Sequence, residues 1–199
     1  MSTITDTILD EKFRQWTAGK DAVQARISIF EHVRDIPYAV LPDLIDAERY
    51  IDILRLGKGS CTPKHFLLGS MFERLGLLVL FAVYAFQWGE RAELLDDYPQ
   101  QLKEMSREMP PSHHLACRVE INGKLVLVDA TLDSPLKKAD LPVNEYWDGF
   151  RDTELPMTPI GEEELYHPVE AHLMQARYDS KSLAFYDELN TCLELVRQS

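Results

Sequence analysis

The feature that most constrains the fold is a hairpin signal at residues 113–132. There the stretches HHLACRVEI and KLVLVDATL flank Asn122-Gly123 and alternate between apolar and polar side chains. The favoured two-residue hairpin turn needs positive φ at both central positions, which Asn-Gly tolerates well. We therefore predict two antiparallel strands with Ile121 opposite Lys124.

The same register brings a histidine beside a carboxylate. Counting outward from the turn places Ala116 opposite Asp129. Because side chains alternate between faces, His114 shares a face with Asp129, and His113 points the other way with Cys117. Diagonal cross-strand Cβ atoms lie about 7–8 Å apart or less, which allows a carboxylate to bond an imidazole. We predict that His114, and not His113, pairs with Asp129.

The second constraining feature is a cysteine at the end of the small-residue turn GKGSC. Thr62 is a good N-cap and Pro63 suits the first turn, so we predict a helix that starts there and ends near Gly76. A helix N-terminus lowers a thiol pKa from about 8.5 toward about 3.5–7.5. Cys61 would lie just before this helix, and Lys64 is expected to favour its thiolate further.

Together these residues predict a Cys–His–Asp triad. Cys61 is the expected nucleophile, His114 the base and Asp129 the group that orients the base. The backbone N–H of Cys61 is an expected oxyanion donor, and Tyr38 and His65 are open candidates for a second. The structural alternatives are a cysteine that packs as a small apolar residue, a His–Asp pair that only stabilises the hairpin, and a His65 that is merely packed or solvated.

These segments resemble the transglutaminase-like superfamily. The stretch GKGSCTPKHFLLGSMFERLGL resembles that family's turn, nucleophilic cysteine and leucine-rich helix, and HLACRVEINGKLVLVDAT resembles its histidine strand, hairpin and Asp-x-Thr segment. The upstream VRDIPYAV is also similar, so the resemblance covers roughly residues 30–133. The chain departs from the family pattern at Ala116 and at Pro63.

The resemblance implies an α+β fold with a papain-like core, in which the cysteine helix packs on an antiparallel sheet. It also implies thiol chemistry on amide or related acyl carbonyls, either hydrolysis or acyl transfer. We expect one domain over residues 1–199, with the core at about 30–133. Outside the hairpin and the cysteine helix, the expected segments are helices over 1–57 with a break at Pro37, a buried strand over 77–88, a surface excursion over 89–112 and a C-terminal helical extension over about 160–199.

Composition limits the partners and the compartment. The net charge of −12 repels phosphate backbones, so nucleic acid is not an expected partner. The most apolar run, residues 75–86, is too short to span a bilayer, so no membrane partner is expected. With no signal-peptide pattern and an odd number of cysteines, three, we expect a cytoplasmic protein without a disulfide framework.

No cofactor or metal is expected. The sequence has no G-x-G-x-x-G and no P-loop, and His167 and His172 are five residues apart where a shared helix face needs four. The predicted function is thus a cysteine-nucleophile enzyme that forms a thioester. The alternatives are a non-catalytic interaction module of the same fold, or a redox sensor that uses Cys61. Substrate and oligomeric state are not specified by the sequence.

Overall fold

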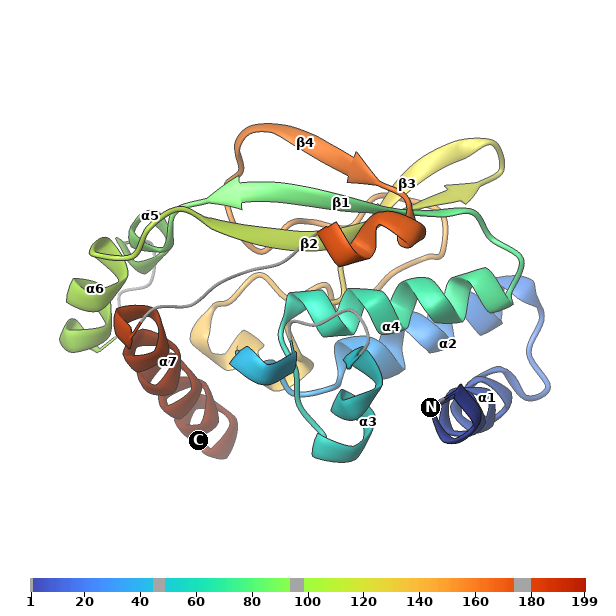
Figure 1. The fold of residues 1–199 in the computed structure, drawn as a ribbon, viewed down its shortest axis with the longest axis horizontal. Helices are drawn as coiled ribbons and strands as arrows, with labels where there is room; N and C mark the ends of the chain where they lie inside the picture. Colours follow the sequence, from blue (N-terminus) through green and yellow to red (C-terminus); the bar gives the residue numbers. More distant parts are fainter. Residues whose placement is uncertain (1, 45–48, 94–98, 174–179) are drawn as a thin grey trace.

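A computed structural model describes residues 2–44, 49–93, 99–173 and 180–199 of the chain. This part is α+β, with an antiparallel sheet and helices gathered largely on one side of it (Figure 1). None of the helices described in these ranges is long and apolar enough to cross a membrane.

The sheet has four strands in the order β3-β2-β1-β4. Neighbouring strands are antiparallel, and their bounds are β1 Val79–Phe86, β2 Ser112–Ile121, β3 Lys124–Val128 and β4 Ile160–Tyr166. The predicted hairpin is confirmed, since Ile121 lies opposite Lys124. Asn122 and Gly123 both have positive φ, 53° and 76°. The predicted buried strand over 77–88 is confirmed as β1.

Strand β4 corrects the prediction that residues 160–199 are helical. Residues 160–166 form an edge strand that pairs with β1, and Gly161 has a φ of 80°. An edge strand has one side in water, so Glu162 and Glu164 can stay exposed there, and the polar pattern hides the strand from sequence analysis. Helix α7, Ser180–Gln198, supplies the predicted C-terminal helix, after the short 3-10 helix η4, Pro168–Leu173. Residues 174–179 lie outside the described part.

The helix that carries the cysteine is α4, Cys61–Arg74. Its N-cap is Ser60, with an extended backbone (φ −82°, ψ −178°), so the predicted N-cap at Thr62 is wrong by two residues. Cys61 is therefore the first helical residue. Pro63 still lies in the first turn, where backbone N–H groups have no intrahelical partner, so the missing N–H of a proline is tolerated there. Gly76, with a φ of 78°, follows the C-cap as predicted.

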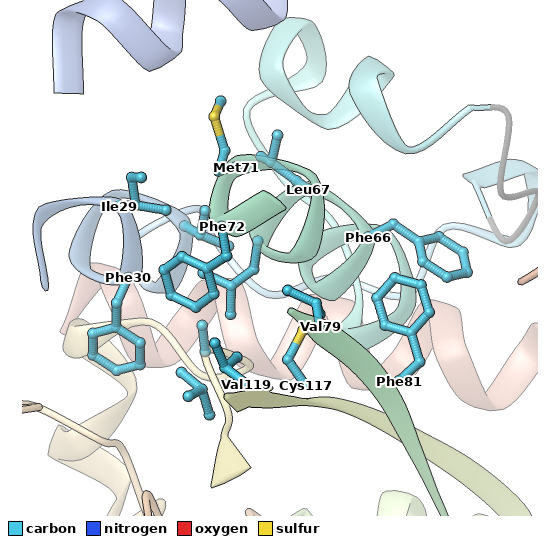
Figure 2. Close-up of a cluster of buried hydrophobic side chains, with 14 of the residues drawn as sticks. Ile29, Phe30, Phe66, Leu67, Met71, Phe72, Val79, Phe81, Cys117 and Val119 are labelled. Atoms are coloured by element: carbon cyan, nitrogen blue, oxygen red, sulfur yellow. The ribbon is translucent and has the colours of Figure 1, made fainter. Parts of the chain in front are cut away.

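Helix α4 packs on the inner face of the sheet, with α2, Ala22–Arg34, beside it and α1, Ser2–Thr17, beyond (Figure 1). A Cβ at Gly69 would lie 3.0 Å from the Phe81 ring, so a glycine allows this close approach. Figure 2 shows the apolar side chains that fill the space between helix and sheet. Cys117 is among them and fully buried, as strand parity predicts.

The N-terminal and middle helical predictions are confirmed in part. Helix α2 ends at Arg34, before Pro37, as expected. The expected helix before Gly57 is broken into 3-10 turns η1, Pro42–Leu44, and η2, Tyr50–Asp52, followed by the short α3, Ile53–Leu56; residues 45–48 lie outside the described part. The excursion over 89–112 contains α5, Trp88–Glu93, and α6, Gln100–Arg107; residues 94–98 are not described.

Helix α7 closes a second apolar cluster at the other end of the molecule. Its inward side chains are Phe185, Leu189 and Leu193, which pack with Leu132 and with Leu136 of the 3-10 helix η3, Ser134–Ala139. Figure 1 shows α7 lying beneath α5 and α6, away from α1. The cluster includes Leu132, which follows the hairpin in the chain. Helix α7 therefore packs against the segment that comes after Asp129.

Candidate active site

The three side chains singled out in the sequence lie together. The Nε2 of His114 is 2.5 Å from Oδ2 of Asp129. The thiol of Cys61 lies close enough to His114 for each of these two groups to shift the pKa of the other. Cys61 is 9% exposed, His114 4% and Asp129 1%, so the chain of contacts is shielded from bulk water.

The thiol of Cys61 lies beside the part of strand β2 that strand β3 does not reach. Strand β3 pairs with β2 only from Cys117 onward, although β2 begins at Ser112. The N–H of Glu120 donates to Leu78 on the β1 side, so by alternation the N–H of Leu115 points to the β3 side. With β3 already ended there, the Leu115 N–H bonds Cys61 instead. The sulfur thus occupies the open edge of β2, where the preceding residue, His114, reaches it.

Electrostatics favour the ion-pair form of Cys61 and His114. Burial raises the pKa of the Cys61 thiol, but the hydrogen bond to His114, the charge of that ring and the Leu115 N–H outweigh burial and lower it. Burial opposes charge on His114 as well, yet Asp129 and Cys61 raise the pKa of the imidazole to about 10. The pKa of Asp129 falls to about 2, because the His114 charge overcomes its burial. The site is arranged to hold thiolate, imidazolium and carboxylate together.

Asp129 is held in place by three further contacts. Its Oδ1 accepts the N–H of Thr131 at 2.9 Å, and its own N–H donates to Oγ1 of Thr153 at 2.7 Å. The amide of Asn144 donates to the Asp129 carbonyl at 3.1 Å. These bonds leave Oδ2 directed at His114, which fixes the orientation of the ring.

His65 is fully buried, so the alternative of a packed histidine is confirmed, and its contacts give it a positioning role that was not predicted. Its Nδ1 lies 2.8 Å from the carbonyl oxygen of Cys61, and its Nε2 accepts the N–H of Ala130 at 2.9 Å. Since a backbone N–H only donates, Nε2 is unprotonated and Nδ1 carries the hydrogen. Burial lowers the pKa of His65 to about 4, so the ring is neutral near pH 7. Both ring nitrogens are used, which removes His65 as an oxyanion donor; its spacing of four residues from Cys61 is the signal that could have indicated its role.

Lys64 does not act as predicted. Its side chain is fully buried, and Nζ donates to the carbonyls of Arg34, Ile36 and Thr131 at 2.8, 2.8 and 2.6 Å. Burial lowers the pKa of Lys64 to about 7 against the opposing charge of Asp133. Three acceptors match the three hydrogens of an ammonium group. Lys64 therefore ties the start of α4 to two other segments, and its ammonium is committed to them and not to the thiol.

The turn before Cys61 is fixed by a bridge to the segment after α2. Gly59 donates to Pro37 at 3.0 Å and accepts from Ala39 at 3.2 Å, which pairs it with Tyr38. A Cβ at Gly59 would lie 2.6 Å from Cγ2 of Ile53, so the position requires glycine. The backbone of Tyr38 beside this turn donates its N–H to Asp133 at 2.8 Å. A role for Tyr38 at an oxyanion stays a prediction.

A small, partly open cleft of about 40 Å³ lies beside the imidazole. Its described lining is mostly apolar and comes from both ends of the chain: Tyr38, Phe86, Trp88, His114, Thr131, Leu132, Leu141, Pro156, Met157, Leu189 and Leu193. Of these lining residues, Trp88 and Met157 are half-buried.

The thiol pKa values of the other two cysteines are shifted in the opposite direction from that of Cys61. Burial raises the pKa of Cys117 and of Cys192. Within the described residues no three His, Cys, Asp or Glu side chains are grouped as a metal site would need. The side chain of His172, weighed with His167 as a zinc pair, lies outside the described part.

Comparisons with protein-family models, curated proteins and solved structures found no match to this chain.

Proposed function

We propose that this protein is a cysteine-nucleophile enzyme with a papain-like, transglutaminase-like core that acts on amide or related acyl carbonyls. The observation that carries the proposal is the contact chain from Cys61 through His114 to Asp129, with a thiol pKa lowered despite burial. A buried structural cysteine has a raised pKa, as Cys117 does.

The mechanism follows from these positions. The Cys61 thiolate attacks the carbonyl carbon, and the charge that develops on oxygen falls near the N–H of Cys61, which has no intrahelical partner at the start of α4. His114 gives its proton to the leaving nitrogen or oxygen as that bond breaks, which leaves a thioester on Cys61. Water or an amine then attacks the thioester, His114 takes the proton of this nucleophile, and the thiolate departs.

A non-catalytic interaction module is the second candidate. The observation in its favour is that Cys61 is only 9% exposed, which restricts the access of a substrate to the sulfur. In such a module the triad contacts would serve stability alone.

Alkylation of Cys61 by iodoacetamide, followed by mass spectrometry across pH, separates the two. We expect Cys61 to react near pH 6 at a rate about tenfold or more above Cys192, which serves as a reference thiol in the same molecule. His114→Ala should abolish this difference. His113→Ala, an exposed neighbour on the opposite face, should preserve it.

Either of two results would contradict the proposed enzyme. If Cys61 and Cys192 titrate alike, or if Cys61 resists alkylation in wild type and in His114→Ala, no thiolate–imidazolium pair exists. The proposal would then be abandoned in favour of the interaction module.

A further inference from the structure

The backbone of Asp129 lies just outside the ladder between β2 and β3. The last pair of that ladder joins Cys117 to Val128, so Asp129 comes one residue past it. The same early end of β3 leaves the Leu115 N–H to the thiol of Cys61. Asp129 is 1% exposed, so its backbone N–H and carbonyl still need partners in the protein.

A segment farther along the chain supplies these partners. Residues 144–154, here called the strap, lie between η3 and β4 and have no regular secondary structure. Thr153 Oγ1 accepts the N–H of Asp129 at 2.7 Å, and the amide of Asn144 donates to the Asp129 carbonyl at 3.1 Å. The strap thus bonds both backbone polar groups of the residue that orients the imidazole.

The strap runs beside β3 like a further strand, with side chains in place of some backbone groups. The N–H of Thr153 donates to the Leu127 carbonyl at 2.9 Å, and Asp152 accepts the Leu127 N–H at 2.7 Å. Two residues after Leu127, the Thr153 hydroxyl continues this pairing at Asp129. The strap therefore takes over the support of the chain at the point where β2 no longer pairs with it.

The strap is itself fixed to the helical core. The Trp147 ring is 6% exposed, and its centroid lies 5.4 Å from that of Phe30 in α2 and 5.9 Å from that of Phe72 in α4. Arg34 of α2 donates to the carbonyl of Asn144 at 3.3 Å. Packing between the two helices thus determines where the strap lies, and the strap holds the triad carboxylate from a fixed position.

We propose that Thr153 and Asn144 are positioning residues, which hold Asp129 where its Oδ2 meets the imidazole. The inference rests on the proposed function and adds two residues to its site. The Thr153 hydroxyl gives its hydrogen to the Leu127 carbonyl at 3.2 Å and keeps a lone pair for the Asp129 N–H. Without this acceptor the buried N–H would be unsatisfied and the backbone would shift. A shift moves Oδ2 from the ring, and a longer contact stabilises the imidazolium less.

The pH profile of Cys61 alkylation by iodoacetamide tests the role of Thr153. Thr153→Val keeps the shape of the side chain and removes the acceptor. We expect the rate near pH 6 to fall by about tenfold or more, because a weaker imidazolium partner lowers the thiolate fraction. Near pH 9.5, where the thiol ionises without help, the rate should stay within about twofold of wild type. Thr153→Ser, which keeps the hydroxyl, should restore the wild-type profile.

Ser28→Ala is the matched control for lost stability. The Ser28 hydroxyl is buried and donates to the Trp16 carbonyl at 2.8 Å, between α2 and α1. The variant loses a buried hydroxyl bond of the same kind and should keep the wild-type profile, which separates positioning from a general loss of stability. Asn144→Ala should change the profile in the same direction as Thr153→Val, and it carries the test if Thr153→Val does not fold.

Titration of the His114 ring by NMR reports on Asp129 without chemistry at Cys61. In the wild type, despite burial, Asp129 helps to raise the pKa of His114 to about 10; Thr153→Val should lower this pKa, and Thr153→Ser should not. If wild-type Cys61 is unreactive near pH 6, the proposed function is wrong, and the His114 titration still decides whether the strap positions Asp129. If Thr153→Val and Asn144→Ala leave the titration of His114 unchanged, the inference is wrong.

Discussion

At the scale of single residues, two neighbouring histidines differ in charge: the ring of His114 is protonated and the ring of His65 is neutral near pH 7. The rings of His65 and His114 are 6.1 Å apart and nearly perpendicular. His114 meets the carboxylate of Asp129 and the thiol of Cys61, so its charge is compensated. His65 meets a backbone carbonyl and a backbone N–H, and only the neutral ring satisfies both. The bonding partners, and not burial alone, decide which ring carries the proton.

His65 should make the protein less stable in mild acid. The folded state binds this proton only near pH 4, whereas the unfolded chain takes it up near pH 6.5. The free energy of unfolding therefore falls as pH drops through this window, by about 3 kcal/mol. His65→Gln should remove this part of the slope in urea unfolding measured at several pH values.

Other groups of the site do not mask this effect. His114, with its raised pKa, is protonated in both states below pH 6.5, and its contribution is lost only as pH rises toward 10. Asp129 loses its contribution below about pH 3.8. His113→Gln, at the exposed neighbouring position, should retain the wild-type slope. An unchanged slope in His65→Gln would contradict the assignment of a neutral ring.

At the scale of elements, the first turn of α4 connects three segments. Cys61 meets β2, Lys64 meets the end of α2 and the segment after β3, and His65 meets the backbone beside Asp129. Because these residues are neighbours in sequence, the helix places three contacts at once. The position of the nucleophile thus depends on side chains that take no part in the chemistry.

Lys64→Met should destabilise the protein by about 3 kcal/mol or more, since three buried carbonyls would lose their donor while the side chain keeps a similar length. The urea midpoint of wild type and variant measures this loss. Lys58→Met, an exposed lysine in the preceding turn, should change stability by less than about 0.5 kcal/mol. Equal midpoints for Lys64→Met and wild type would show that the ammonium contributes nothing.

At the scale of the whole molecule, the C-terminal helix is fastened to the site by a buried ion pair. Arg197 donates to both carboxylate oxygens of Asp133, at 2.8 and 2.7 Å, and to the carbonyl of Tyr38 at 2.8 Å. Asp133 is 1% exposed, and its Oδ1 also accepts the N–H of Tyr38. Through this pair α7 is joined to the segments that flank both the turn before Cys61 and the strand end at Asp129.

Arg197→Met should release α7 and cost about 3–5 kcal/mol, because Asp133 would stay buried without its partner. Hydrogen exchange along residues 180–198 should quicken before global unfolding. Lys181→Met removes an exposed ion pair of the same helix and should change stability by less than about 1 kcal/mol. Slow exchange in α7 of Arg197→Met would show that apolar packing alone fastens the helix.

The predictions that succeeded rest on short-range patterns. Asn122-Gly123 determines the turn, and strand periodicity then selects His114 as the partner of Asp129. The errors have local reasons too. Ser60 and Thr62 are both competent caps, so the first helical residue depended on how the chain enters from Gly59. Strand β4 has an exposed, acidic pattern, and its pairing partner β1 lies far away in sequence.

By itself, the sequence determined the hairpin register, the pairing of His114 with Asp129 and the presence of a cysteine at a helix start, because each follows from backbone geometry over a few residues. Only the tertiary structure decided that the thiol occupies the edge left open by β3, that Lys64 and His65 position it, and that α7 walls a cleft beside His114. These contacts join residues far apart in the chain, and no local periodicity encodes which distant segments meet.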